Sequence, residues 1–106
     1  MTPRFRIEPE ASAELGEAAV WYEKRRAGLG GEFLDAVDGT LEFISLFPGA
    51  GTSLPDLPPE LAVRRVPVRR FPFHVVYLEL TDDVIRILAF AHDRRSPGYW
   101  HSRVQN

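Results

Sequence analysis

The sequence has 106 residues, enough for one small domain over residues 1–106 and too few for a second one. Its 44% hydrophobic and 26% charged residues are typical of a globular protein and exclude extensive disorder. The lack of cysteine excludes disulfide bonds and thiolate metal sites, and the net charge of −2 argues against a protein that binds nucleic acid through overall charge.

The first half of the chain is predicted to form a strand followed by two helices. Residues 4–7 alternate charged and apolar side chains, as in a half-buried strand, and Pro9 suits the first turn of a helix. Apolar side chains at three- and four-residue spacing then predict helices over about 10–26 and 33–47. The glycine-rich stretch between them predicts a short turn, so the two helices form an αα-hairpin.

The second half is predicted to form an antiparallel meander. Residues 48–60 are rich in Gly and Pro, which predicts an irregular connection. Three stretches rich in β-branched and aromatic residues follow at 62–71, 73–80 and 84–91, with a turn at 81–83. Pro67 cannot donate a ladder hydrogen bond, so its strand is expected at an edge or a bulge, and its register is left open. The expected fold is α+β, with an N-terminal strand and an α-helical hairpin packed on one face of an antiparallel β-sheet.

An arginine-rich surface is predicted on the sheet face that the helices leave uncovered. Residues 1–60 contain five Lys and Arg against eleven Asp and Glu, whereas residues 61–106 contain eight, all Arg, against four. Because strand side chains alternate between faces, this open face is predicted to carry Arg65, Arg69, Arg86 and His92. The C-terminal segment is predicted to add a rim of Arg94, Arg95, Tyr99, Trp100, His101 and Arg103.

Such a surface suits two kinds of ligand, RNA and protein, and it is also consistent with a charged face that binds no ligand. Arginine neutralises phosphate while aromatic rings stack on bases, which suits RNA, and the same side chains dominate protein–protein interfaces, which suits an acidic protein segment. The simpler interpretation is a solvated charged face. In that case His92 is a strand-end imidazole bonded to the backbone, while Tyr99 and Trp100 hold the C-terminal segment on the core.

The sequence predicts a cytoplasmic protein without a metal or a cofactor. The first ten residues are charged where a signal peptide is apolar, and no apolar run approaches the roughly 18 residues needed to span a bilayer. His74, His92 and His101 do not have the spacing of metal ligands.

Several short motifs, in order along nearly the whole chain, are similar to those of a known family. They are Ala11-x-x-Glu14-Leu15, Trp21-Tyr22, Gly28-Leu29, Phe47-Pro48, the stretch 64–73, and the ending His92-Asp93-Arg94-Arg95-Ser96-Pro97-Gly98-Tyr99-Trp100. In these features the chain resembles the RelE/ParE toxin superfamily of type II toxin–antitoxin systems, some members of which are called plasmid-stabilisation proteins. The resemblance implies the fold described above and a cognate antitoxin that forms a hetero-oligomer with the toxin and masks its working surface.

The resemblance implies growth arrest by one of two activities. ParE-like members poison DNA gyrase by binding it, whereas RelE-like members cleave mRNA on the ribosome without a metal. In a nuclease, His92, Arg65, Arg69 and Tyr99 would take the catalytic roles. In either case, Arg86, Arg94, Arg95, Trp100 and Arg103 would bind the partner or the RNA.

The ParE-like activity is the one that the sequence favours. RelE itself uses lysines on its sheet, which this chain lacks, and the chain is acidic overall although a ribosomal target is RNA. Whether the chain is an enzyme is left open at this point. A third interpretation is a degenerate, non-toxic member that binds only an antitoxin.

Overall fold

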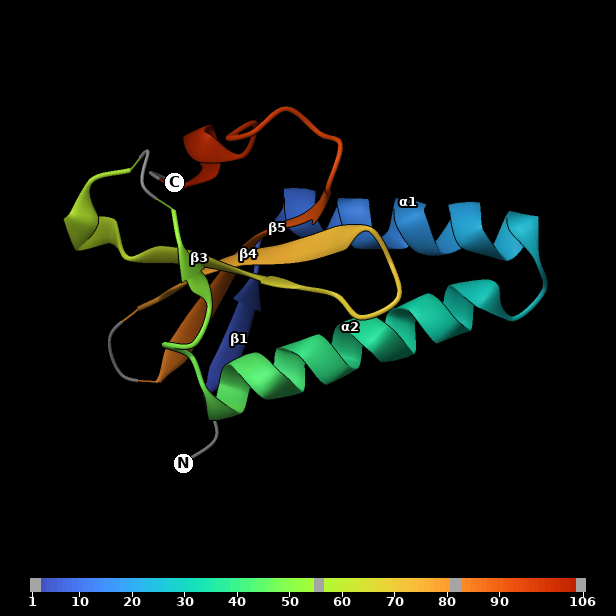
Figure 1. Ribbon diagram of the computed structural model, residues 1–106, viewed down its shortest axis with the longest axis horizontal. Helices are drawn as coiled ribbons and strands as arrows, with labels where there is room; N and C mark the ends of the chain where they lie inside the picture. The colour runs from blue at the N-terminus through green and yellow to red at the C-terminus, as the bar shows by residue number, and fades with distance from the viewer. Residues whose placement is uncertain (1–2, 55–56, 81–82, 105–106) are drawn as a thin grey trace.

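The computed structural model describes residues 3–54, 57–80 and 83–104, which form two helices and a five-stranded sheet (Figure 1). The helices are α1 (Pro9–Arg25) and α2 (Leu29–Leu46). The strands are β1 (Arg4–Ile7), β2 (Thr52–Ser53), β3 (Val63–Pro67), β4 (Phe73–Glu79) and β5 (Val84–His92). Their order in the sheet is β1-β5-β4-β3-β2. The predicted α+β fold and its helical hairpin are therefore confirmed.

The hairpin turn is closed by a single carboxylate. Gly28 adopts a left-handed conformation with φ of 89°, which glycine tolerates without steric cost. The Glu23 carboxylate then accepts hydrogen bonds from the backbone N–H groups of Gly28 at 2.8 Å and Gly30 at 3.0 Å. A Cβ atom on Gly30 would lie 2.5 Å from the Ala19 carbonyl oxygen, so this glycine lets the two helices approach closely. The predicted turn is thus shorter than expected, because α2 already begins at Leu29.

The sheet is mixed rather than purely antiparallel. Strands β3, β4 and β5 form the predicted meander, and β1 pairs with β5 in parallel. The two-residue strand β2, within the stretch predicted to be irregular, pairs with Arg64 and Arg65. Pro67 lies beyond β2 and pairs with His74, so it occupies the edge position that was predicted for it. In the predicted turn at 81–83, Thr81 and Asp82 lie outside the described residues.

The hairpin covers one face of the sheet, and the C-terminal segment covers the other. Phe33, Val37 and Ile44 of α2 belong to the core on the hairpin side. On the opposite face, Trp100 and Val104 of the C-terminal segment are 4% and 9% exposed. They pack there with Val63, Val76, Leu78, Leu88, Ala89 and Ala91 of the sheet. The expectation of an uncovered sheet face is therefore wrong.

A β-bulge explains why simple alternation assigned the faces of β5 incorrectly. Val76 pairs with Ala89 and Tyr77 pairs with Ile87, so Leu88 is an extra residue opposite β4. The bulge reverses the alternation within β5. As a result Phe90 belongs to the core under the hairpin, whereas Leu88 belongs to the core under the C-terminal segment.

Candidate functional site

Arg86 is part of the interior of the protein and not of an open surface. It is 5% exposed and forms an ion pair with Glu8, the residue that precedes α1. Its guanidinium group also donates hydrogen bonds to the backbone carbonyl oxygens of Val104, at 2.9 Å, and of Arg103. The placement of Arg86 on a partner-binding surface is therefore wrong, because all these contacts hold the C-terminal segment against β5.

Arg103 is held in a second internal ion pair. Its Nη1 and Nη2 atoms donate to the two carboxylate oxygens of Glu14 at 3.0 and 3.1 Å, and Nη1 also donates to the Leu88 carbonyl oxygen at 3.0 Å. Burial lowers the pKa of Arg103, but the hydrogen bond and charge of Glu14 raise it overall. Arg103 and the buried Trp100 thus fasten the C-terminal segment, contrary to the prediction that both face a partner.

Tyr99 donates its hydroxyl hydrogen bond to the same Glu14 carboxylate, at 2.6 Å. Burial, followed by this hydrogen bond and the negative charge of Glu14, raises the pKa of Tyr99 well above its ordinary value of 10.0. A phenol in this state keeps its proton at neutral pH. The arrangement therefore supports a structural role for the Tyr99 hydroxyl more strongly than the acid/base role considered for it.

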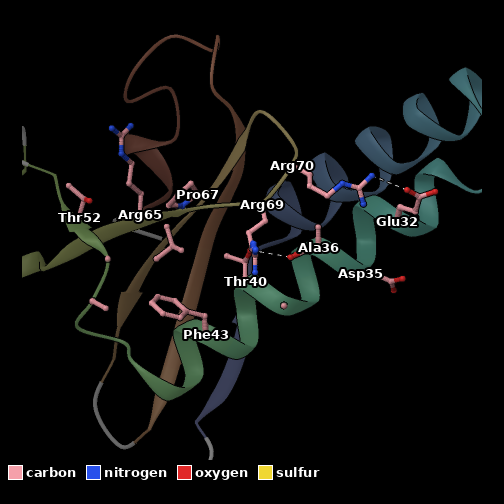
Figure 2. A pocket seen from close by; sticks show the side chains of 14 residues that line it. Glu32, Asp35, Ala36, Thr40, Phe43, Thr52, Arg65, Pro67, Arg69 and Arg70 are labelled. Atoms are coloured by element: carbon pink, nitrogen blue, oxygen red, sulfur yellow. Dashed lines mark hydrogen bonds and ion pairs between the residues drawn. The ribbon is translucent and has the colours of Figure 1, made fainter.

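The remaining predicted catalytic residues come together only in part. Arg65, His92 and Tyr99 line one small cavity of about 110 Å³, beside His74. The Nδ1 atom of His92 accepts a hydrogen bond from the Arg94 backbone N–H at 3.0 Å, as in a strand-end imidazole. Figure 2 shows Arg65 pointing toward the C-terminal segment and Arg69 pointing toward α2, so these two arginines diverge.

A wide groove lies between α2 and strands β2 and β3, and we call it the α2–β3 groove (Figure 2). It has a volume of about 850 Å³. On the α2 side it is lined by small residues followed by one ring, at Ala36, Gly39, Thr40 and Phe43. The Thr40 hydroxyl donates to the Ala36 carbonyl oxygen at 3.1 Å, so this wall offers mainly apolar surface. The α2 side also carries the carboxylates of Glu32 and Asp35. The other lining residues are Ala50, Gly51, Thr52, Arg65, Val66, Pro67, Arg69 and Arg70.

The charges at the strand side of the α2–β3 groove are positive. Arg70 is engaged at one end, where its Nη2 atom lies 3.0 Å from Glu32 Oε1. Hydrogen bonds from Arg70 and then Arg26 lower the pKa of Glu32. Arg65 and Arg69 are exposed and form no ion pair within the part of the chain that the structure describes. The groove therefore combines an apolar wall with Arg69, which points toward α2 and is available to an acidic group of a ligand, while Arg65 points toward the C-terminal segment and the exposed Asp35 lies on the α2 side.

Exposed apolar side chains continue beyond the groove at the end of α2. Phe43 is 42% exposed, Leu46 is 65% exposed and Phe47 is 56% exposed. The rings of Phe43 and Phe47 lie 5.5 Å apart between centroids. Contiguous apolar surface of this kind is typical of a protein-binding site. The sequence predicted that Arg65 and Arg69 are exposed, but it did not predict the apolar α2 side of the groove. The small residues Ala36 and Gly39 before Phe43 are the sequence feature that indicates it.

Arg94 and Arg95 are exposed, as the prediction of a basic rim requires. The Arg95 guanidinium lies 3.9 Å from the centroid of the Tyr99 ring. Their role in binding stays a prediction. Among the described residues, no cluster of three or more His, Asp and Glu side chains has an arrangement that could hold a metal ion. Neither α1 nor α2 combines the length and apolar character of a membrane-crossing helix.

Comparisons with known proteins agree with this architecture. The family described as "ParE toxin of type II toxin-antitoxin system, parDE" matches residues 5–97. A solved structure described as "Chromosomal ParDE TA system from P. aeruginosa" is similar, with a TM-score of 0.68 and 16% sequence identity. The similarity covers 86% of this chain and 96% of that one. At this identity it supports the fold, while the family match covers most of the sequence. No curated protein matches the chain.

Proposed function

Because the chain belongs to the family of ParE toxins of type II toxin–antitoxin systems, we propose that it arrests bacterial growth by binding a protein target. We further propose that an antitoxin neutralises it by occupying the α2–β3 groove, as part of a hetero-oligomer in the cytoplasm. The target favoured here is DNA gyrase, which the ParE-like activity implies.

One observation carries the proposal of the antitoxin site: an apolar groove of about 850 Å³ whose strand side carries Arg69, which points toward α2 and has no carboxylate partner in the described chain. An amphipathic antitoxin segment fits this arrangement. Its apolar side chains would lie against Ala36, Gly39 and Phe43, and an Asp or Glu side chain would pair with Arg69. The exposed rings of Phe43 and Phe47 would extend the same interface.

Action by protein binding is supported by the fate of the predicted RNA-binding residues. Arg86 and Arg103 each form internal ion pairs, and Trp100 is buried. These contacts remove three side chains of the predicted basic surface, whichever ligand it was expected to bind. An RNA target needs such a basic surface, whereas a protein target can bind an apolar groove. The net charge of −2 also disfavours association with ribosomal RNA.

A second candidate function, RNA cleavage, is favoured by the small cavity that Arg65, His92 and Tyr99 share. Such a site would need a base for the 2′-hydroxyl proton and a cation for the phosphate, which His92 and Arg65 would supply. The raised pKa of Tyr99 and its hydrogen bond to Glu14 weaken this candidate, because they make the Tyr99 hydroxyl a weaker acid whose proton is already donated to Glu14.

Expression of the chain alone in bacteria tests the proposed function. We expect growth arrest with filamentation and broken DNA, and we expect the purified protein to inhibit supercoiling by purified DNA gyrase. Arrest of translation with cleaved mRNA would favour RNA cleavage instead. Unchanged growth at high levels of folded protein would favour a degenerate member that binds only an antitoxin.

A further inference from the structure

A second groove runs along α1, away from the α2–β3 groove. Its α1 wall is formed by residues that recur at three- and four-residue spacing and so lie on one helical face: Glu14, Glu17, Ala18, Trp21 and Tyr22. Its other wall is formed by Phe73, Phe90, His92, Arg95 and Tyr99. The groove has a volume of about 340 Å³, and we call it the aromatic groove. It shares no lining residue with the α2–β3 groove.

Tyr22 on the α1 wall and Tyr99 on the opposite wall are held in place by contacts within the protein. The Tyr22 ring lies 5.1 Å from the Phe33 ring and 5.0 Å from the Phe71 ring, measured between centroids. Tyr99 is anchored on the opposite wall by its hydrogen bond to Glu14. Side chains that are already immobilised lose little conformational entropy on binding, so this surface is preorganised for a ligand.

A ring on each wall of the aromatic groove, Trp21 and Tyr99, has an arginine stacked on it; Arg95 lines the groove itself, and Arg25 lies outside its lining. The Arg25 guanidinium lies 4.1 Å from the Trp21 ring centroid, and the Arg95 guanidinium lies 3.9 Å from the Tyr99 ring centroid. Neither arginine forms an ion pair with a carboxylate of the described residues. Trp21 is 52% exposed, although tryptophan is usually well buried. Trp, Tyr and Arg are the residues most enriched among binding hot spots.

We propose that the aromatic groove is the surface through which the toxin binds its protein target, separately from the antitoxin. Its occupant is a target segment that inserts one large apolar side chain between Trp21 and Tyr99. Carboxylates on both flanks of that segment pair with Arg25 and Arg95. This inference rests on the proposed function in one respect, namely that the target is a protein.

The charges of the aromatic groove favour a protein segment over a nucleic acid. Glu17 is an exposed residue of α1 that lines the groove, and its carboxylate would repel a continuous phosphate backbone, whereas the charge of Glu14 is already neutralised by Arg103. A protein segment avoids this repulsion, because its carboxylates are needed only at the two flanks. The exposed Glu17 carboxylate can also accept a hydrogen bond from a backbone N–H of the segment.

The test compares Trp21→Ala with Val20→Ala in the full chain. Val20 is the matched control, because it is 55% exposed on the same helix and lines neither groove. Growth arrest on expression, inhibition of purified DNA gyrase and affinity for the antitoxin encoded beside the toxin are measured for each variant. Circular dichroism confirms that each one is folded.

We expect Trp21→Ala to weaken gyrase inhibition about 30-fold, as for a hot-spot tryptophan, and to abolish growth arrest. Its affinity for the antitoxin is expected to remain within twofold of the wild type, and Val20→Ala should behave as the wild type throughout. Arg25→Gln and Arg95→Gln should each weaken inhibition and reduce its sensitivity to salt.

Several results would overturn the inference. One is a folded Trp21→Ala variant that arrests growth as the wild type does, and another is a loss of antitoxin binding in place of toxicity. If the wild type cleaves mRNA and Trp21→Ala abolishes the cleavage, the occupant is RNA. A wild type that arrests growth without inhibiting gyrase contradicts the proposed target alone, and the growth assays of the variants still decide the role of the groove. A wild type that does not arrest growth overturns both proposals.

Discussion

Arg86 and Glu8 form a buried ion pair that connects strand β5, which lies between β1 and β4, to the residue preceding α1. Their side chains are 6% and 13% exposed, and the Glu8 backbone N–H also donates to the Ile87 carbonyl oxygen at 3.1 Å. The same guanidinium holds the carbonyl oxygens of Arg103 and Val104. One side chain therefore connects β5, the start of the hairpin and the C-terminal segment.

Replacement of Arg86 by methionine is expected to destabilise the fold by about 3–5 kcal/mol, because it leaves the Glu8 carboxylate buried without a partner. The double variant Glu8→Leu with Arg86→Met should recover part of this loss, since it removes both charges. Urea denaturation measures both free energies of unfolding. A stable Arg86→Met protein that has lost only partner binding would show that Arg86 acts at a surface after all.

The three tyrosines of the chain are expected to resist ionisation in the folded protein. Burial raises the pKa of Tyr22, Tyr77 and Tyr99 above the ordinary value of 10.0, with the Glu14 hydrogen bond adding to the effect at Tyr99. Raised values contribute stability that is complete below pH 10 and is lost as the pH rises through the folded-state pKa values. Ultraviolet absorbance should thus show phenolate formation coinciding with alkaline unfolding. Ionisation of all three near pH 10 in folded protein would refute this.

Glu32 is expected to titrate below its ordinary pKa of 4.5, because Arg70 and then Arg26 donate hydrogen bonds to its carboxylate. A lowered pKa contributes stability that is present above pH 4.5 and is lost as the pH falls through the folded-state value. A titration of the Glu32 carboxyl signal by NMR measures this pKa. It should rise in the Arg70→Gln variant, and an unchanged value would mean that the contact between α2 and the β3–β4 turn does not persist in solution.

Arg69 is expected to contribute electrostatically to antitoxin binding. Arg69→Glu reverses a charge on the rim of the α2–β3 groove, so it should slow association with the antitoxin about tenfold and reduce its salt dependence. Arg6→Glu is the matched control, because Arg6 is exposed on β1 and lines no part of that groove. Stopped-flow fluorescence measures the rates. Equal slowing by both variants would indicate a general effect of net charge and no specific contact.

Periodicity predicted most of the fold, because helices and strands with one buried side repeat their apolar residues every 3.6 or two positions. The parallel pairing of β1 with β5 was not predicted, since two short strands 77 or more residues apart leave no local pattern that sets their direction. The bulge at Leu88 also leaves no signal in an apolar strand, and it reversed the faces assigned to the residues after it.

The site was harder to predict than the fold, because an arginine in a strand is usually exposed unless a distant partner neutralises it. Glu8 is 78 positions from Arg86, and Glu14 is 89 positions from Arg103, so no local spacing in the sequence predicts these ion pairs. Trp100 was likewise assigned to a rim, since its packing depends on the C-terminal segment folding back over the sheet. The α2–β3 groove is lined by residues of α2 and of the segments around β2 and β3, and no local sequence pattern predicts how these elements lie relative to one another.

The most direct test of the proposed antitoxin site fills the α2–β3 groove without disturbing the fold. Gly39 lines the groove, and a Cβ atom there would meet no other atom within 4 Å. Gly39→Leu should therefore place a large side chain in the groove while raising helix stability by up to about 1 kcal/mol. Gly31→Leu is the matched control, because Gly31 lies on the same helix, has equally open space and is outside the groove.

The deciding measurement is calorimetric titration of the antitoxin into the wild type and these two variants. We predict that Gly39→Leu weakens antitoxin binding at least 100-fold, while Gly31→Leu binds as the wild type does and both variants still arrest growth. Binding of the antitoxin to Gly39→Leu with wild-type affinity would contradict the proposed site, because it would show that the antitoxin binds without occupying the α2–β3 groove.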